Sequence, residues 1–135
     1  IQGMNQSNSN YGEEILIPNA KTNDIGLFIT SLYTWKEINS LQGGIRFDHR
    51  KMESEEHQIV HEDEIHVFEA LDQSFQNFTA SLGYKTVLFS NIISRFNFAS
   101  GFRAPNLAEL TSNGIHHGTN RYEVGNPNLN SEQNF

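Results

Sequence analysis

Apolar and polar side chains alternate along four stretches of the chain. Such alternation predicts β-strands, because successive side chains of a strand point to opposite faces. The four predicted strands lie near residues 23–35, 38–50, 74–84 and 91–101. One face of these strands is apolar, and it consists of Ile25, Leu27, Ile29, Leu41, Ile45, Phe47, Phe78, Leu82, Phe96 and Phe98.

The connections between these strands are alternately short and long. The short ones span about 36–38 and 85–90, and the long ones span 51–73 and 102–131. Strands of about ten residues with one apolar face, joined in this way, are typical of transmembrane β-barrels. A soluble β-sandwich shows the same alternation, so the pattern alone leaves both architectures open.

Two groups of residues fit the barrel interpretation. Aromatic side chains lie next to the short connections, where a barrel carries a girdle at the membrane interface; they are Tyr33, Trp35 and Tyr84. The opposite, polar faces of the strands carry Gln42, Arg46, Arg95 and Asn97. We expect these four to face the lumen, because an arginine facing lipid at mid-membrane costs about 2–4 kcal/mol.

Composition excludes several classes of protein. The 135 residues include 9 Lys and Arg against 16 Asp and Glu, and this net charge of −7 argues against a nucleic-acid partner. No apolar run is long enough for a transmembrane helix. The chain has no cysteine, which excludes disulfides, a cysteine nucleophile and thiolate zinc sites. Ile1 is not followed by a signal peptide, so we expect an internal fragment of a longer protein.

Two motifs near the end of the chain point to one family. Residues 99–110 contain Phe102-Arg103-Ala104-Pro105, and residues 125–132 contain Asn126-Pro127-Asn128-Leu129. This pair resembles the FRAP and NPNL motifs of TonB-dependent outer-membrane receptors. The stretch Gly43-Gly44-Ile45-Arg46-Phe47-Asp48 is similar to a recurring barrel strand of that family. Asn130-Ser131 stands where many members carry Lys-Pro, a difference confined to a turn.

The resemblance implies an all-β fold: an antiparallel up-and-down meander forming part of a 22-stranded transmembrane β-barrel. Residues 1–135 would be a fragment of the barrel domain, with the N-terminal plug and the closing strands outside it. The implied function is energy-coupled uptake of a scarce nutrient, an iron chelate or haem, across the outer membrane of a Gram-negative bacterium. The implied partners are the TonB energy-coupling complex, reached through the plug, the small ligand and outer-membrane lipid. A soluble or surface-displayed β-rich binding or adhesion module is the alternative.

Candidate ligand contacts follow from the same resemblance. Haem receptors of this kind carry a histidine between the two motifs, where this chain has His116 and His117. Glycines on both sides would let the backbone bring an imidazole over a ligand. Arg103 is the third candidate, either attracting an anionic ligand at the barrel mouth or pairing with Glu109 to fix the loop.

The acidic stretch 51–73 carries eight of the acidic residues and one lysine. It also contains His57, His61 and His66, and a helix there would place the first two on one face, with imidazole and carboxylate groups suited to zinc. A solvated loop is the simpler interpretation, and we predict no metal site. No nucleophile elbow, phosphate loop or HExxH motif is present, so we expect neither a catalytic site nor a cofactor.

Overall fold

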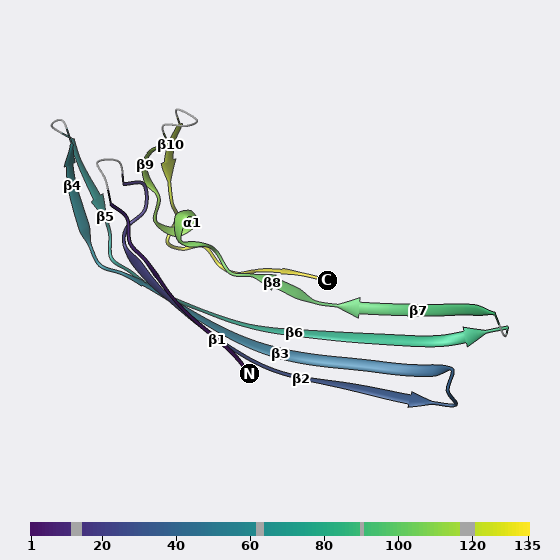
Figure 1. Ribbon diagram of the computed structural model, residues 1–135. Coiled ribbons are helices and arrows are strands. Elements are labelled where there is room, and N and C mark those ends of the chain that lie inside the picture. The colour runs from purple at the N-terminus through teal and green to yellow at the C-terminus, as the bar shows by residue number, and fades with distance from the viewer. Residues whose placement is uncertain (12–14, 62–63, 90, 117–120) are drawn as a thin grey trace.

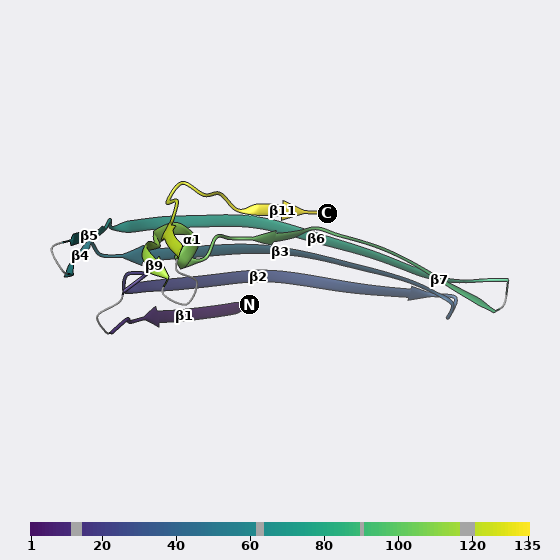
Figure 2. The same cartoon turned by 90° about the horizontal axis from the view of Figure 1, so that it is seen from above.

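A five-stranded antiparallel sheet dominates the computed structural model, which describes residues 1–11, 15–61, 64–89, 91–116 and 121–135. The strands pair in the order β1-β2-β3-β6-β7, and the two views show them lying side by side in one curved sheet (Figures 1 and 2). Their bounds are β1 Gln2–Asn8, β2 Ala20–Trp35, β3 Asn39–Ser54, β6 Leu71–Leu88 and β7 Ile92–Ala99. The predicted antiparallel meander is thus confirmed, and the polar start of the chain adds a further strand, β1.

The predicted strands are present, and three of them are longer than the alternation indicated. β2 and β3 have 16 residues each and β6 has 18. The added residues continue the ladder at the end where the long connections lie, as in the pairing of Ala20 with Ser54 and of Ser54 with Leu71. We call this end of the sheet the loop end, and the end with the short connections the turn end.

The register separates two faces of the sheet. Leu27, Phe47 and Phe78 are cross-strand partners, so they lie in one row on one face. We call this the apolar face, and its large side chains are exposed: Phe78 is 58% and Phe96 65% accessible. The neighbouring residues on the same three strands, Gly26, Asp48 and Asn77, are also cross-strand partners, and they lie on the opposite face, which we call the polar face. A continuous apolar surface of this extent needs a covering apolar phase or partner.

The long connections are not irregular loops, and that part of the prediction is wrong. Residues 51–73 include the hairpin of β4 (His57–His61) and β5 (Glu64–Phe68). Residues 102–131 include the short helix α1 (Leu107–Thr111) and the hairpin of β9 (Asn113–His116) and β10 (Arg121–Val124). Backbone pairing rather than side-chain alternation defines these short hairpins, which explains why the sequence pattern missed them.

The segment after β7 folds over the concave side of the sheet (Figure 1). β8 (Gly101–Arg103) continues the direction of β7 and pairs with β11 (Glu132–Asn134). A cluster of buried apolar side chains joins this segment to the polar face near the loop end; its members are Met52, Leu71, Phe75, Ala104 and Leu110, with Phe102 and Leu107 packed against them. Burying this surface stabilises the fold over the sheet.

No helix in the described ranges has the length and apolar character needed to cross a bilayer.

Candidate functional site

The helix α1 begins directly after the Phe-Arg-Ala-Pro motif, and its first turn closes on itself. The side chain of Asn106 accepts a hydrogen bond from the backbone N–H of Glu109 at 2.9 Å. The Glu109 carboxylate in return accepts from the backbone N–H of Asn106 at 2.9 Å. This reciprocal capping box satisfies two donors that a helix start would otherwise leave free. It explains why so short a helix forms immediately after Pro105.

Arg103 holds two acidic side chains at the edge of this helix. Its guanidinium donates to both carboxylate oxygens of Glu109 at 2.8 Å and to the carboxylate of Glu132 at 2.9 and 3.1 Å. Hydrogen bonding from the Asn106 N–H and from Arg103 lowers the pKa of Glu109. Arg103 likewise lowers the pKa of Glu132. The expected pairing of Arg103 with Glu109 is present, and the guanidinium is already shared between two carboxylates.

The Asn-Pro-Asn segment connects this helix to the sheet. The side-chain amide of Gln73 donates to the carbonyl of Pro127 at 3.2 Å, and that of Asn77 donates to the hydroxyl of Ser131 at 3.1 Å. Both amides project from β6 on the polar face, and they fix the return of the chain towards β11. The turn that replaces the usual Lys-Pro of the motif therefore supplies a contact through Ser131.

A ladder of charge pairs lies on the polar face beside this segment. Arg46 donates to both oxygens of Asp48 at 2.5 and 2.6 Å, and Arg50 donates to both oxygens of Asp24 at 2.7 and 2.8 Å. Bidentate pairs of this kind are the geometrically specific form of an arginine–carboxylate contact. Gly26 leaves room for the Arg46 guanidinium in this position, since a Cβ there would overlap Nη2 of Arg46 and the arginine side chain would have to move.

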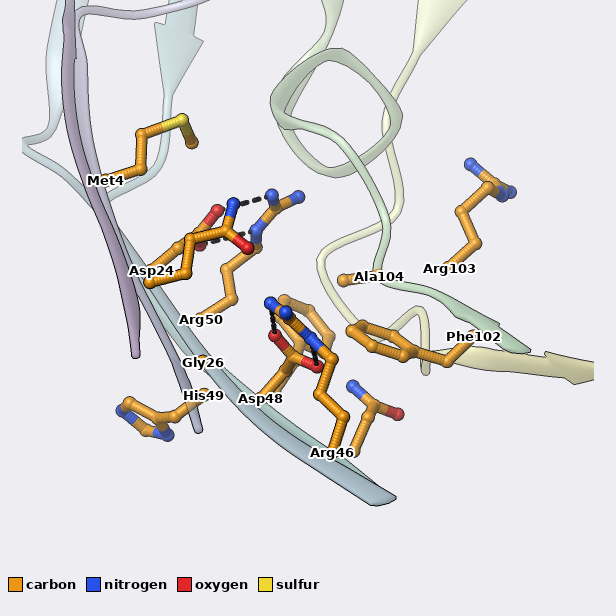
Figure 3. Close-up of a pocket in the computed structure, with 13 residues that line it drawn as sticks. Met4, Asp24, Gly26, Arg46, Asp48, His49, Arg50, Phe102, Arg103 and Ala104 are labelled. Atoms are coloured by element: carbon orange, nitrogen blue, oxygen red, sulfur yellow. Dashed lines mark hydrogen bonds and ion pairs between the residues drawn. The ribbon is translucent and has the colours of Figure 1, made fainter. Parts of the chain in front are cut away.

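These pairs line a cavity of about 360 Å³ between the sheet and the folded-over segment. Phe102 and Ala104 face the charge pairs across the cavity, whereas Arg103 points away from them (Figure 3). The cavity is therefore charged on its sheet side and apolar on the opposite side. Its ion pairs are internally neutral, so it offers hydrogen-bonding groups without a net attraction for one sign of charge.

The β9–β10 hairpin is fastened to its neighbours through Asn113. Its backbone N–H donates to the carbonyl of Leu16 at 3.1 Å, and its side-chain amide donates to the carbonyl of Val67 at 3.0 Å. The same side chain accepts from the hydroxyl of Tyr122 at 2.9 Å. One residue thus joins the connection after β1, the β4–β5 hairpin and the β9–β10 hairpin at the loop end.

The chain was compared with known proteins and families. A family described as TonB dependent receptor-like, beta-barrel, matches residues 2–135. The chain belongs to this family. Its members are outer-membrane components of Gram-negative bacteria that take up ligands by TonB-coupled transport. Searches of curated proteins and of solved structures found no match.

In this receptor barrel, the four residues expected on the polar side lie on one face of the sheet. Gln42 and Asn97 flank Gly83 in a single row across β3, β6 and β7. Arg46 belongs to the charge-pair ladder, and Arg95 lies nearer the turn end, opposite Lys85 of β6. The register therefore brings Arg46 to the cavity and leaves Arg95 away from it.

The histidine candidates are only partly described. His116 ends β9, where its backbone pairs with Arg121; its side chain and all of His117 lie outside the described residues. The helical arrangement considered for His57 and His61 is wrong, because both belong to strand β4. Residues four apart in a strand are about 13 Å apart. Within the described ranges, no three His, Cys, Asp or Glu side chains are grouped to hold a metal ion.

The predicted aromatic group is assembled at the turn end of the receptor's apolar face. Trp35 stacks on Tyr33 with ring centroids 5.6 Å apart and on Tyr84 at 6.0 Å. The Tyr84 hydroxyl donates to the side-chain oxygen of Asn39 at 3.1 Å. An apolar ring body with a bonded polar tip suits the boundary between hydrocarbon and water.

Sequence reasoning missed several residues that build this region. Asn106 and Glu109 carry the spacing of a capping box, a signal that is visible in the sequence. The pairing of Asp24 with Arg50 depends on the register of two strands, and the role of Asn113 depends on the arrangement of three loops. Neither of these has a local sequence signal.

Proposed function

We propose that this receptor takes up an iron chelate or haem and that its polar face lines the lumen of the barrel. The separation of the two faces is the observation that supports this orientation. Arginine and aspartate side chains project from one face, and most of the large apolar side chains of the long strands project from the other. Lipid against the polar face would have to accommodate Arg46 and Arg50, at a cost of about 2–4 kcal/mol for each arginine near the midplane.

The ligand class rests on the β9–β10 hairpin. It carries His116, with His117 next along the chain, and Asn113 fastens it at the loop end, the extracellular end of such a barrel. Neutral imidazole is a good ligand for iron and haem. Arg103 is the weaker ligand candidate, because Glu109 and Glu132 already occupy its guanidinium. We therefore propose that Arg103 fixes the segment between β8 and α1 to β11 near the loop end, which we call the rim.

The proposed role is transport and not catalysis. Energy would come from the TonB complex through a plug inside the barrel, and the apolar face would contact outer-membrane lipid. The family membership favours this role over a soluble or surface-displayed adhesion module. Extraction tests the choice: a barrel segment in its full-length receptor requires detergent to leave the membrane, whereas an adhesion module is released by salt or protease.

Histidine substitutions in the full-length receptor test the ligand class. We expect His116→Ala or His117→Ala to reduce uptake of haemin or a ferric chelate at least severalfold, with unchanged receptor in the membrane. His57→Ala, in the other hairpin of the loop end, is the matched control and should leave uptake unchanged. Unchanged uptake and affinity in both single variants and in the double variant, for haemin and for each ferric chelate tried, would contradict the ligand class.

A further inference from the structure

The cavity on the polar face presents opposite charges side by side. Arg46, Asp48 and Arg50 follow one another on this face of β3, and all three line the cavity. Asp24 of β2, the cross-strand partner of Arg50, lines it as well. Each arginine is paired with one aspartate, so a cation and an anion stand next to each other twice. A molecule in this cavity therefore meets both signs of charge at once.

The two arginines keep donors for a further partner. A guanidinium carries five N–H donors, and the contacts with the aspartates use only Nε and Nη2 of each arginine. Within the described residues, Nη1 of Arg46 and Nη1 of Arg50 donate no hydrogen bond. Both arginine side chains are 32% accessible, and this partial exclusion of water strengthens polar contacts. The arginines can thus bind a carboxylate without releasing their aspartates.

The remaining wall of the cavity is apolar. Phe102 and Ala104 face the charge pairs from the folded-over segment (Figure 3). Phe75, the cross-strand partner of Arg50, is buried in the same apolar cluster. Gly26 leaves the sheet side open, because a Cβ there would lie 2.8 Å from the Asp48 carboxylate. This arrangement suits a molecule with a charged end and an apolar end.

Volume and charge together narrow the class of ligand. At about 30 Å³ for each water-sized group, the 360 Å³ cavity holds on the order of a dozen non-hydrogen atoms. This is the size of one amino acid such as phenylalanine, and haem is far larger. A molecule with a single charge would also meet the like charge of each pair, and such a contact selects against it. A zwitterion avoids this mismatch.

We propose that this cavity binds a zwitterionic α-amino acid with an apolar side chain. Its carboxylate accepts hydrogen bonds from the Nη1 groups of Arg46 and Arg50. Its ammonium group donates to Asp24 or Asp48, and its side chain lies against Phe102. None of the described residues that line the cavity belongs to the β9–β10 hairpin, so the site is separate from the histidines proposed to bind the transported chelate.

Equilibrium dialysis of the purified full-length receptor in detergent against radiolabelled phenylalanine tests this proposal. We expect saturable binding that unlabelled leucine abolishes, since leucine also carries both charges and an apolar side chain. The analogue 3-phenylpropionate lacks the ammonium group, and phenethylamine lacks the carboxylate. Each should compete at least about tenfold more weakly than phenylalanine, because it leaves one set of polar groups without a partner.

A pair of glycine variants locates the binding. Gly26→Ala adds a methyl group that displaces the Arg46 guanidinium, and it should weaken phenylalanine binding by about tenfold or more. Gly43→Ala, on the apolar face of β3, is the matched control and should bind normally, since its Cβ would make only ordinary contacts of 3.9 Å or more.

Three results would overturn the proposal. The absence of saturable phenylalanine binding would exclude an amino-acid site. Equal competition by either analogue would show that recognition does not require both charges, and unchanged binding in Gly26→Ala would exclude this cavity. The analogue comparison uses the unaltered receptor, so it decides the question even if Gly26→Ala does not assemble. Because no haemin or ferric chelate is present, a wrong ligand class in the uptake experiment would leave this result unaffected.

Discussion

The backbone of Gly125 lies against the end of α1, and its N–H donates a 2.6 Å hydrogen bond to the carbonyl of Ser112. The next residue, Asn126, donates from its N–H to the carbonyl of Glu109 at 2.8 Å. Carbonyls at the end of a helix have no partner within the helix and need one from outside. The Asn-Pro-Asn segment thus secures the helix that begins after the Phe-Arg-Ala-Pro motif, and this contact joins the two motifs in the folded chain.

Replacing Gly125 by alanine should disrupt this contact. A Cβ there would lie 2.5 Å from the backbone nitrogen of Thr111 and 2.6 Å from the carbonyl carbon of Leu110. Overpacking against backbone typically costs about 1–3 kcal/mol. We expect faster hydrogen exchange in residues 107–116 of the full-length Gly125→Ala receptor. Gly114→Ala is the control, since its nearest contact would be an ordinary 3.6 Å; equal exchange in both variants would refute the role of Gly125.

The rim at Arg103 should weaken in acid. The pKa of Glu109 is lowered by the Asn106 N–H and by Arg103, and that of Glu132 is lowered by Arg103. A lowered folded-state pKa gives stability above the ordinary carboxyl pKa, and this stability is lost as pH falls through the folded value. We expect backbone hydrogen exchange in residues 103–112, corrected for its intrinsic pH dependence, to become faster at pH values below the ordinary pKa range of glutamate.

Arg103→Gln tests the cause of this pH dependence. Removing the guanidinium should move the loss of protection to higher pH, because both carboxyl pKa values then move back towards their ordinary values. The Asn106 contact to Glu109 remains, so part of the dependence should persist. An unchanged midpoint in Arg103→Gln would show that the guanidinium does not stabilise the rim.

The turn between β2 and β3 contains a substitution that should stabilise the receptor. Lys36 and Glu37 have φ angles of 51° and 56°, a left-handed conformation that glycine adopts without a Cβ penalty. The left-handed conformation costs a non-glycine residue about 1–2 kcal/mol, and the greater unfolded-state entropy of glycine offsets about 0.5–1 kcal/mol of the gain. We expect Glu37→Gly to raise the unfolding free energy of the full-length receptor in urea by up to about 1 kcal/mol. Ser40→Gly, within β3, should lower it by about 0.5–1 kcal/mol. A destabilised Glu37→Gly receptor would contradict the turn geometry.

Arginine substitutions on the two faces should have unequal effects. Leu82→Arg places a charge on the apolar face and should cost about 2–4 kcal/mol if it faces lipid near the midplane. Gln42→Arg places the same charge on the polar face of the neighbouring strand β3, opposite Gly83, and should cost much less. Refolding titrations of the full-length receptor into lipid vesicles measure both. Equal losses would contradict the assignment of the faces.

The sequence predicted the parts of the fold that alternation governs. The two faces of the four long strands follow from residues such as Leu41, Ile45 and Phe47 and their polar neighbours, and the register confirms which positions share a face. The alternation reverses its phase beyond residue 50, where β3 continues through Met52 to Ser54. There the polar face is buried, with Met52 in the cluster that includes Ala104 and Leu110, whereas Lys51 and Glu53 lie on the opposite face. The pattern that identified the strand therefore stops before the strand does.

The candidate site was less predictable because most of its contacts join distant segments. The pairing of Arg103 with Glu109 was one of the two roles that the sequence left open for Arg103, since the two residues lie only six positions apart. Glu132, the second partner of Arg103, comes into reach only through the pairing of β8 with β11. The opposition of Lys85 and Arg95 likewise depends on the register of two strands, which no local pattern specifies.

Site-directed spin labelling along β3 tests the central claim, that the apolar face meets lipid and the polar face lines the lumen. Single labels at consecutive positions 44–47 of the full-length receptor in bilayers would be compared for collision with oxygen, which concentrates in lipid. We predict high oxygen accessibility at Ile45 and Phe47 and low accessibility at Gly44 and Arg46. The reverse alternation, or equal accessibility at all four positions, would contradict this orientation of the sheet.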